Sequence, residues 1–185
     1  MDIRIRDAIP ADAGAIAKIY AHYVETTCVT FEETAPPAGE ILARMQKVMQ
    51  FGLPWYAAET PDGDVVGYAY ASPFHPRSAY RFTLENSVYV DPMHARAGIG
   101  RALMNRLMDE CARRGYRQMI ALIGDRANDA SIRLHAGLGF EPIGALSGVG
   151  LKFGRWADVV LMQRPLGAGA GTVPVSELGD GKRIN

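Results

Sequence analysis

The stretch from Thr83 to Leu103 constrains the fold more than any other, because its hydrophobic period changes abruptly. Thr83 to Val90 alternates between two faces and is rich in β-branched and aromatic residues, which predicts a strand. From Ile99 on, apolar residues recur every fourth position opposite a charged face, which predicts an amphipathic helix. The segment Ala95-Arg96-Ala97-Gly98-Ile99-Gly100 lies between them. Its two glycines permit close approach of a ligand, and the free N–H groups of the helix start favour an anion such as phosphate.

The bulk properties of the chain favour one domain that binds small molecules. Its 185 residues allow one substantial core, and 20 Lys and Arg against 20 Asp and Glu leave no basic excess for nucleic acid or a membrane surface. Cys28 and Cys111 are the only cysteines, so neither a disulfide framework nor a metal site is indicated. Because neither a signal peptide nor an apolar stretch of membrane-spanning length is visible, we expect a cytoplasmic protein.

The periodicity along the chain predicts mixed α/β structure in the order β-α-α-β-β-β-α-β-α-β-β. The expected elements other than the central pair are a strand at 3–5, helices from Pro10 and from about Gly39, strands at Trp55–Glu59, Val65–Ala71 and Met119–Ile123, a helix at Asn128–Leu138, and a closing strand pair at Phe140–Ile143 and Phe153–Met162. Residues 1–166 therefore form the predicted domain. Residues 167–185 begin with G-A-G-A-G-T, lose all periodicity, and are predicted to be a flexible tail.

Three stretches together resemble one family. The loop is similar to the Gln/Arg-x-x-Gly-x-Gly/Ala loop with which the GNAT superfamily of acetyl-CoA-dependent N-acyltransferases wraps the pyrophosphate of coenzyme A, although Ala95 stands at the Gln/Arg position. A second match reads Asn128-x-x-Ser131-x-x-x-His135-x-x-x-Gly139-Phe140. The runs L-E-N-S-V-Y-V, S-I-R-L-H-A-G-L-G-F and V-G-L-K-F-G-R-W-A-D-V narrow the resemblance to phosphinothricin and methionine sulfoximine N-acetyltransferases.

The resemblance implies the GNAT fold, a mixed central sheet with helices on both faces, and acetyl-CoA as co-substrate. Main-chain N–H groups around Val90 are expected to polarise the thioester carbonyl. Arg101 is expected to contact the pyrophosphate, and its alternative is a charged residue on the solvated face of the helix. The implied acetyl-CoA contacts are Val88, Tyr89, Val90, Arg96, Ala97, Gly98, Ile99, Gly100, Arg101, Asn128 and Ser131.

Glu85 and His135 are the catalytic candidates that the resemblance implies. Glu85 is the expected general base, directly or through water, provided that burial raises its pKa or the amine binds already neutral. The alternative to this catalytic role is that Glu85 is a solvated strand residue or forms an ion pair with an arginine. His135 is expected to exchange a proton with the thiolate or the amine, and its alternative is a packing residue with satisfied nitrogens. Because Cys111 lies on the packed stripe of its helix, we expect direct transfer without an acetyl-enzyme.

The substrate expected from the resemblance is a small amino acid analogue such as phosphinothricin, methionine sulfoximine or methionine sulfone. Arg77 and Lys152 would hold its oxygens and Phe31 and Trp156 its short apolar linker. Tyr80 and Glu85 complete the expected substrate contacts. Polyamines, aminoglycosides, peptide amino termini and a non-catalytic acyl-CoA-binding module remain alternatives. The resemblance also implies a homodimer, with an apolar patch around Phe153, Trp156 and Val160.

Overall fold

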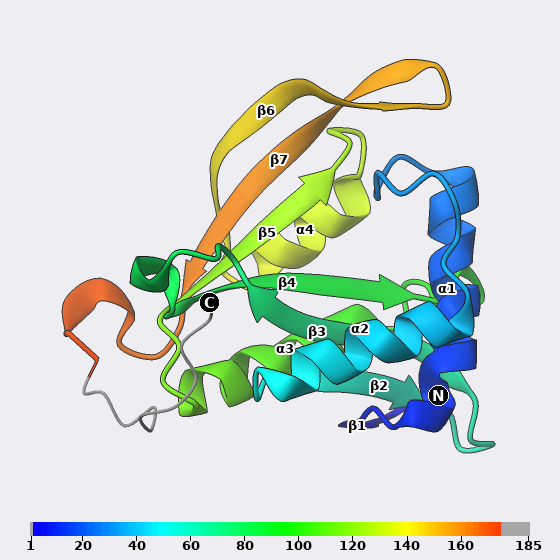
Figure 1. Ribbon diagram of the computed structural model, residues 1–185, viewed down its shortest axis with the longest axis horizontal. Coiled ribbons are helices and arrows are strands. Elements are labelled where there is room, and N and C mark those ends of the chain that lie inside the picture. Colours follow the sequence, from blue (N-terminus) through cyan, green and yellow to red (C-terminus); the bar gives the residue numbers. More distant parts are fainter. Residues whose placement is uncertain (1, 175–185) are drawn as a thin grey trace.

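The chain folds into a twisted sheet with helices packed on it (Figure 1), and the computed structural model describes residues 2–174. The predicted order of strands and helices is confirmed. The elements are β1 (Arg4–Asp7), α1 (Ala13–Thr26), α2 (Ala38–Gln50), β2 (Trp55–Glu59), β3 (Val65–Pro73), β4 (Thr83–Val90), α3 (Ile99–Arg113), β5 (Gln118–Gly124), α4 (Asp129–Gly137), β6 (Glu141–Lys152) and β7 (Arg155–Pro165).

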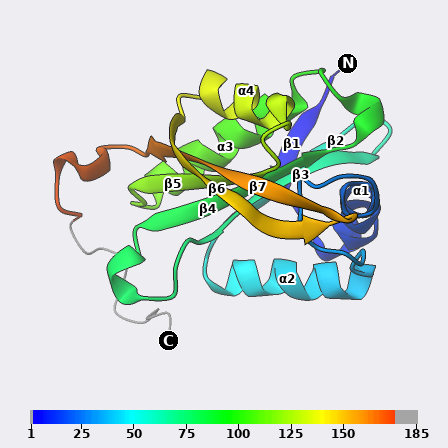
Figure 2. The ribbon, with the colours of Figure 1, turned by 90° about the horizontal axis from the view of Figure 1, so that it is seen from above.

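Seven strands form one sheet in the order β1-β2-β3-β4-β5-β7-β6. All neighbours are antiparallel except β4 and β5, which are parallel. Helices α1 and α2 cover one face, and α3 and α4 cover the other (Figure 2). The predicted mixed sheet with helices on both faces is therefore confirmed.

The two parallel strands at the centre of the sheet separate soon after they meet. Pairing between β4 and β5 is limited to Thr83–Glu85 against Gln118–Ile120, although β4 continues to Val90 and β5 to Gly124. Figure 1 shows β5 rising away from β4 beyond this point. The divergence opens a gap through the sheet at its centre, beside the predicted phosphate loop.

The apolar stripe of α3 packs into the core as its period predicts. Leu103, Leu107 and Cys111 are completely buried against the sheet. Burial of a leucine side chain stabilises the fold by roughly 1.5–3 kcal/mol. This packing fixes the start of α3 beside the gap between β4 and β5.

The closing strands are longer than predicted. The structure extends β6 from Glu141 to Lys152, whereas the sequence predicted a strand that ends at Ile143. The register shifts twice along β6, between Pro142 and Gly144 and between Leu146 and Gly150. Glycines at these bulges interrupt the side-chain alternation on which strand prediction relies. The result is a long hairpin of β6 and β7 that reaches past the rest of the sheet (Figure 1).

The predicted tail falls partly within the described residues. Gly169–Gly171 form a short 3₁₀ helix, and the N–H of Leu166 donates to the carbonyl of Arg117. Residues 175–185 lie outside the described residues, so the flexible tail stays a prediction. Within residues 2–174, no helix combines the length and hydropathy that a membrane crossing requires.

Candidate active site

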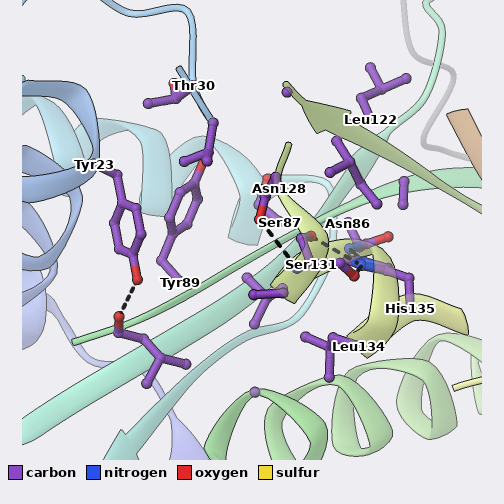
Figure 3. A pocket seen from close by; sticks show the side chains of 18 of the residues that line it. Tyr23, Thr30, Asn86, Ser87, Tyr89, Leu122, Asn128, Ser131, Leu134 and His135 are labelled. Atoms are coloured by element: carbon purple, nitrogen blue, oxygen red, sulfur yellow. Dashed lines mark hydrogen bonds between the residues drawn. The ribbon is translucent and has the colours of Figure 1, made fainter. Parts of the chain in front are cut away.

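A cavity of about 900 Å³ occupies the gap between β4 and β5. Its walls come from both strands, the loop before α3, the first turn of α3, helix α4, and the segment after α1. Tyr23 and Tyr89 lie on one side of it, and Asn86, Ser131 and His135 on the other (Figure 3). These segments are far apart in the sequence, and the divergence of the two strands brings them together.

The predicted phosphate loop forms one end of this cavity. Gly98 is the residue before α3 and has a φ of 80°, a left-handed conformation that glycine adopts without strain. The N–H groups of the first turn of α3 have no partners within the helix, so they are donors for an anion. Of the predicted loop residues, only Ala97 does not contribute to the cavity wall.

The main chain of β4 presents polar groups to the gap. The N–H of Asp91 donates to the carbonyl of Val66 on β3 at 2.9 Å. Because peptide groups alternate in direction along a strand, the N–H groups of Val88 and Val90 face the opposite side, toward β5. The Tyr23 hydroxyl donates to the Val90 carbonyl at 2.5 Å, a contact that the sequence did not predict. The Val88 and Val90 N–H groups can therefore donate to a molecule in the gap.

Helix α4 carries a capped start toward the cavity. The Oδ1 of Asn128 accepts a hydrogen bond from the Ser131 N–H at 3.2 Å, and both residues line the wall. Arg101 also lines the wall, while its Nη1 donates to the Gly137 carbonyl at 2.9 Å. Arg101 thus connects α3 to the end of α4. The sequence had predicted either a pyrophosphate contact or a solvated charge, and not this contact.

Glu85 lies where β4 and β5 part, opposite Ile120 in the last paired position. Its side chain is partly buried in the cavity wall, and burial raises the pKa of its carboxyl group. Among residues 2–174, no ion pair or side-chain hydrogen bond involves this carboxylate. An unpaired carboxyl group with a raised pKa can accept a proton from a bound molecule more readily than a solvated one.

His135 is almost completely buried and both of its ring nitrogens have partners. Nδ1 lies 2.8 Å from the Ser131 carbonyl oxygen, which only accepts, so Nδ1 carries the proton. Nε2 then accepts from the Asn86 Nδ2 at 2.9 Å. Burial lowers the pKa of His135, which favours the neutral ring. The hydrogen-bond partners therefore assign His135 as a neutral Nδ1–H tautomer.

Asn86 is a site residue that sequence reasoning missed. It lines the cavity and is 7% exposed, and its Oδ1 has no hydrogen-bond partner in the described part of the chain. Glu85 and Asn86 are adjacent on a strand, so their side chains point to opposite faces. Glu85 faces the side of α1 and α2, and Asn86 faces α3 and α4. Both reach one cavity because the cavity passes between the strands.

Only part of the predicted substrate set lies on the cavity wall. Phe31 and Glu85 line it, together with Tyr89, which was predicted as an acetyl-CoA contact, and the unpredicted Tyr20, Tyr70 and Ser87. Lys152 lies instead under the segment after α1, where its Nζ donates to the Thr30 carbonyl at 2.8 Å. Residues outside the wall that project toward solvent are Arg77, Tyr80 and Trp156.

Lys152 departs from the prediction because β6 continues well past Ile143, where the sequence predicted its end. Trp156 lies within the predicted strand, but its side chain leaves the face of the hairpin opposite to that of Lys152 and is exposed. Arg77 precedes a 3₁₀ helix at Ser78–Tyr80 that lies at the surface between β3 and β4. Within residues 2–174, no group of three His, Cys, Asp or Glu side chains is arranged to hold a metal ion.

Known proteins share this sequence and architecture. Residues 16–140 match the acetyltransferase (GNAT) family. A phosphinothricin N-acetyltransferase of Alcaligenes faecalis is 52% identical over 163 residues, 88% of this chain and 82% of that protein. An L-methionine sulfoximine/L-methionine sulfone acetyltransferase of Salmonella typhimurium is 40% identical over 162 residues, 88% and 94% of the two chains.

The structural comparison agrees with the sequence comparison. A phosphinothricin acetyltransferase of Sinorhizobium meliloti, solved in complex with acetyl-CoA, superposes with a TM-score of 0.92 at 44% identity, over 96% of this chain and 95% of the other. The match to the family spans most of the chain and includes β4, the loop, α3 and α4. The chain belongs to the GNAT family of acetyltransferases.

Proposed function

We propose that the chain transfers the acetyl group of acetyl-CoA to the α-amino group of a small amino acid analogue such as phosphinothricin, methionine sulfoximine or methionine sulfone. One observation carries this proposal: a single cavity passes through the sheet, with the start of α3 at one end and Glu85 facing the other side. Two molecules can therefore meet in the gap from opposite faces. The relatives named above support acetyl-CoA as one of these molecules and an amino acid analogue as the other.

The residues present suit acetyl-CoA. The first turn of α3 offers N–H groups to the pyrophosphate, and Arg96 adds a positive charge at the same loop. The N–H groups of Val88 and Val90 face the gap, where they suit the pantetheine arm and the thioester carbonyl. Asn128 and Ser131 contribute polar groups from α4.

In the proposed reaction the neutral amine attacks the thioester carbon directly in a ternary complex. Its nitrogen forms the amide bond, the C–S bond breaks, and the coenzyme A thiolate leaves. Glu85 accepts the proton that the amine loses, directly or through water. The two cysteines do not line the cavity, and burial raises the pKa of the Cys111 thiol to about 12. An acetyl-cysteine intermediate is therefore not part of this proposal.

His135 has a narrower proposed role than an immediate proton donor. In the neutral tautomer its Nδ1–H is committed to the Ser131 carbonyl, and its Nε2 is an acceptor. It can return a proton to the thiolate only after taking one up and releasing Asn86. We therefore assign the first proton transfer to Glu85, and to His135 a second transfer that depends on the movement of Asn86.

The acceptor side of the cavity suits a short substrate. Tyr20, Phe31, Tyr70 and Tyr89 give it aromatic walls around the Glu85 carboxylate. Arg77 lies outside the cavity wall and Lys152 already donates to the Thr30 carbonyl, so this proposal assigns the substrate carboxylate to neither of them. A polyamine would need several unpaired carboxylates, whereas Glu32, near this side, is paired with Arg44.

A thiol-release screen with acetyl-CoA tests the proposal. Phosphinothricin, methionine sulfoximine and methionine sulfone are compared with spermidine, an aminoglycoside and a short peptide. We expect the highest kcat/KM with one of the three analogues. A higher value for any of the others would replace the proposed acceptor, and acetyl-CoA binding without thiol release from any amine would favour a non-catalytic module.

We also propose a cytoplasmic homodimer. The β6–β7 hairpin exposes Phe153 and Trp156, which are 60% and 66% accessible, with Leu146, Val149 and Leu151 beside them. Val160 contributes less to this patch because it packs partly against the core. An apolar surface of this kind suits a two-fold interface. Two free, buried cysteines suit a reducing compartment.

A further inference from the structure

We infer that Gly150 and Lys152 of the β6–β7 hairpin are positioning residues that fix Phe31 as the wall of the acceptor site and so limit the size of the amine. This inference rests on the proposed function and deepens it. The segment concerned is residues 27–34, which follow α1 and are called the strap below. Three contacts hold the strap on the side of β5 and the hairpin.

The first contact joins the strap to the end of β5. A Cβ at Gly124 would lie 2.7 Å from the Val29 carbonyl oxygen and 2.8 Å from that of Cys28. These are main-chain atoms, which cannot rotate away as a side chain can. The strap backbone therefore lies directly on the backbone of β5, at the open end of the gap between β4 and β5.

The second contact joins Phe31 to the hairpin. A Cβ at Gly150 would lie 2.4 to 2.6 Å from three atoms of the Phe31 ring. The ring thus packs against the hairpin backbone, and Phe31 also lines the cavity. Gly150 does not have a positive φ, so it is close approach, and not backbone conformation, that requires glycine here.

The third contact is made by a buried lysine. Lys152 is 2% exposed and its Nζ donates to the Thr30 carbonyl at 2.8 Å. None of the ion pairs within residues 2–174 includes Lys152. Burial of an ammonium group with one main-chain acceptor is costly and lowers its pKa. The strap compensates this cost through the Thr30 carbonyl and the nearby charges of Glu32 and Glu33, and the Phe153 ring, 5.0 Å from Nζ, adds a contact within the hairpin.

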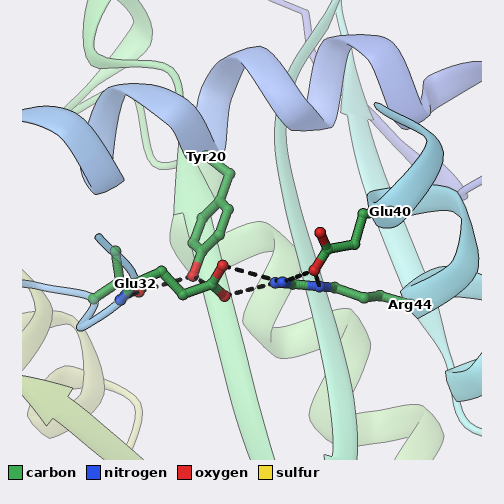
Figure 4. A network of polar contacts seen from close by, with 5 residues as sticks. Tyr20, Glu32, Glu40 and Arg44 are labelled. Atoms are coloured by element: carbon green, nitrogen blue, oxygen red, sulfur yellow. Dashed lines mark hydrogen bonds and ion pairs between the residues drawn. The ribbon is translucent and has the colours of Figure 1, made fainter. Parts of the chain in front are cut away.

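The other side of the strap is held by α1 and α2 (Figure 4). The Tyr20 hydroxyl lies 2.7 Å from Thr30 Oγ1 and donates to Glu32 at 2.9 Å. The Arg44 guanidinium donates to both Glu32 carboxylate oxygens, at 2.6 and 3.0 Å. Thr30 is thus bound through its side chain to α1 and through its carbonyl to the hairpin. The strap lines the cavity with Val29, Thr30 and Phe31 and is anchored on both sides.

A strap anchored in this way keeps Phe31 from moving outward. Because the ring packs on Gly150, a methyl group there displaces it from its place in the wall. Reacting groups that are misplaced by about 1 Å lose roughly 10²-fold in rate. Loosening the strap should therefore impair transfer to small amines, reduce the discrimination against bulky ones, and leave acetyl-CoA binding from the α3 side unchanged.

The kinetic test compares Gly150→Ala with Gly39→Ala, the same change at a helical position where the added Cβ meets no atom within 4 Å. The acceptors are phosphinothricin and the bulkier phenylalanine. In Gly150→Ala we expect kcat/KM for phosphinothricin to fall about tenfold or more relative to phenylalanine, with the Kd of acetyl-CoA within about twofold. An unchanged ratio, or an equal loss of acetyl-CoA affinity, would overturn the inference.

Hydrogen–deuterium exchange provides a readout that needs no activity. Lys152→Met keeps the buried stem but removes the ammonium, and Lys47→Met on the exposed face of α2 is its control. We expect amides of residues 27–34 to exchange about tenfold faster in Lys152→Met only, with α3 unaffected. Unchanged exchange in the strap contradicts the inference. If the strap exchanges faster in Lys152→Met but the wild-type protein transfers acetyl to no amine, the role of the strap is supported and the proposed function is rejected.

Discussion

Replacement of Glu85 by glutamine tests the proposed chemistry most directly. The change keeps the shape of the side chain and removes its ability to accept a proton. Since no residue among 2–174 pairs with the carboxylate, the change breaks no ion pair that holds the fold. We expect kcat with the best amine to fall about 10²–10⁴-fold, the usual contribution of a positioned base. This loss corresponds to about 3–5 kcal/mol of transition-state stabilisation.

Stability should move in the opposite direction to activity. Burial raises the pKa of Glu85 in the folded protein, so ionisation of this group costs more in the folded than in the unfolded state. That cost appears as the pH rises above the unfolded pKa, and it reaches its full size above the folded pKa. Glu85→Gln removes it. We therefore expect the Tm at pH 7 to stay the same or to rise.

The assays are thiol release across pH, titration calorimetry with acetyl-CoA, and thermal unfolding. The wild type should lose kcat/KM as the pH falls through the raised pKa of Glu85, and the variant should lack this limb. Acetyl-CoA affinity should change little, because Glu85 faces the other side of the sheet from α3. If Glu85→Gln keeps near-full kcat at every pH, Glu85 is not the base and the reasoning fails.

Four further predictions follow from other contacts. His135→Phe retains the packing against Phe140 but cannot accept from Asn86, so steady-state assays should show a smaller loss of kcat than in Glu85→Gln. Initial rates at varied acetyl-CoA and amine should give intersecting reciprocal plots, since parallel plots would indicate an acetyl-enzyme. Hydrogen bonds from Arg113 and Arg114 lower the pKa of Glu110 to about 2, so in denaturant titrations Glu110→Gln should be less stable than wild type at pH 7, and this difference should shrink as the pH falls toward 2. Leu103→Ala should lower the free energy of unfolding by about 2–5 kcal/mol in the same assay, because it empties a fully buried site on α3.

Local periodicity was sufficient to predict the order of the elements and the phosphate loop. The change of period at Ile99 and the left-handed residue Gly98 are properties of neighbouring residues, so the sequence shows them directly. The length of β6 was not predictable in the same way. Its bulges at Gly144 and Gly148 break the alternation, and only pairing with β7 keeps the strand continuous.

The candidate site was harder to predict, because its contacts join residues far apart in the chain. The Tyr23 hydroxyl reaches the Val90 carbonyl across 67 positions, and Lys152 reaches Thr30 across 122. Neither pair leaves a pattern in the sequence. The sequence predicted Lys152 as a substrate ligand because a basic side chain suits the oxygens of the expected amino acid analogue. In the structure, the Lys152 ammonium instead donates its hydrogen bond to the Thr30 carbonyl of the strap.

The geometry of β4 suits the proposed direct transfer between two substrates bound at one site. Adjacent residues on a strand point to opposite faces, so an intact sheet would separate Glu85 from Asn86 and His135. Because β4 and β5 part just after Glu85, groups on both faces reach the same space. The carboxylate then lies on the side of the aromatic walls, where we propose the amine binds, and the N–H groups of α3 lie on the side proposed for the coenzyme. Direct transfer needs both molecules at once, and the parting of these two strands is what makes room for both.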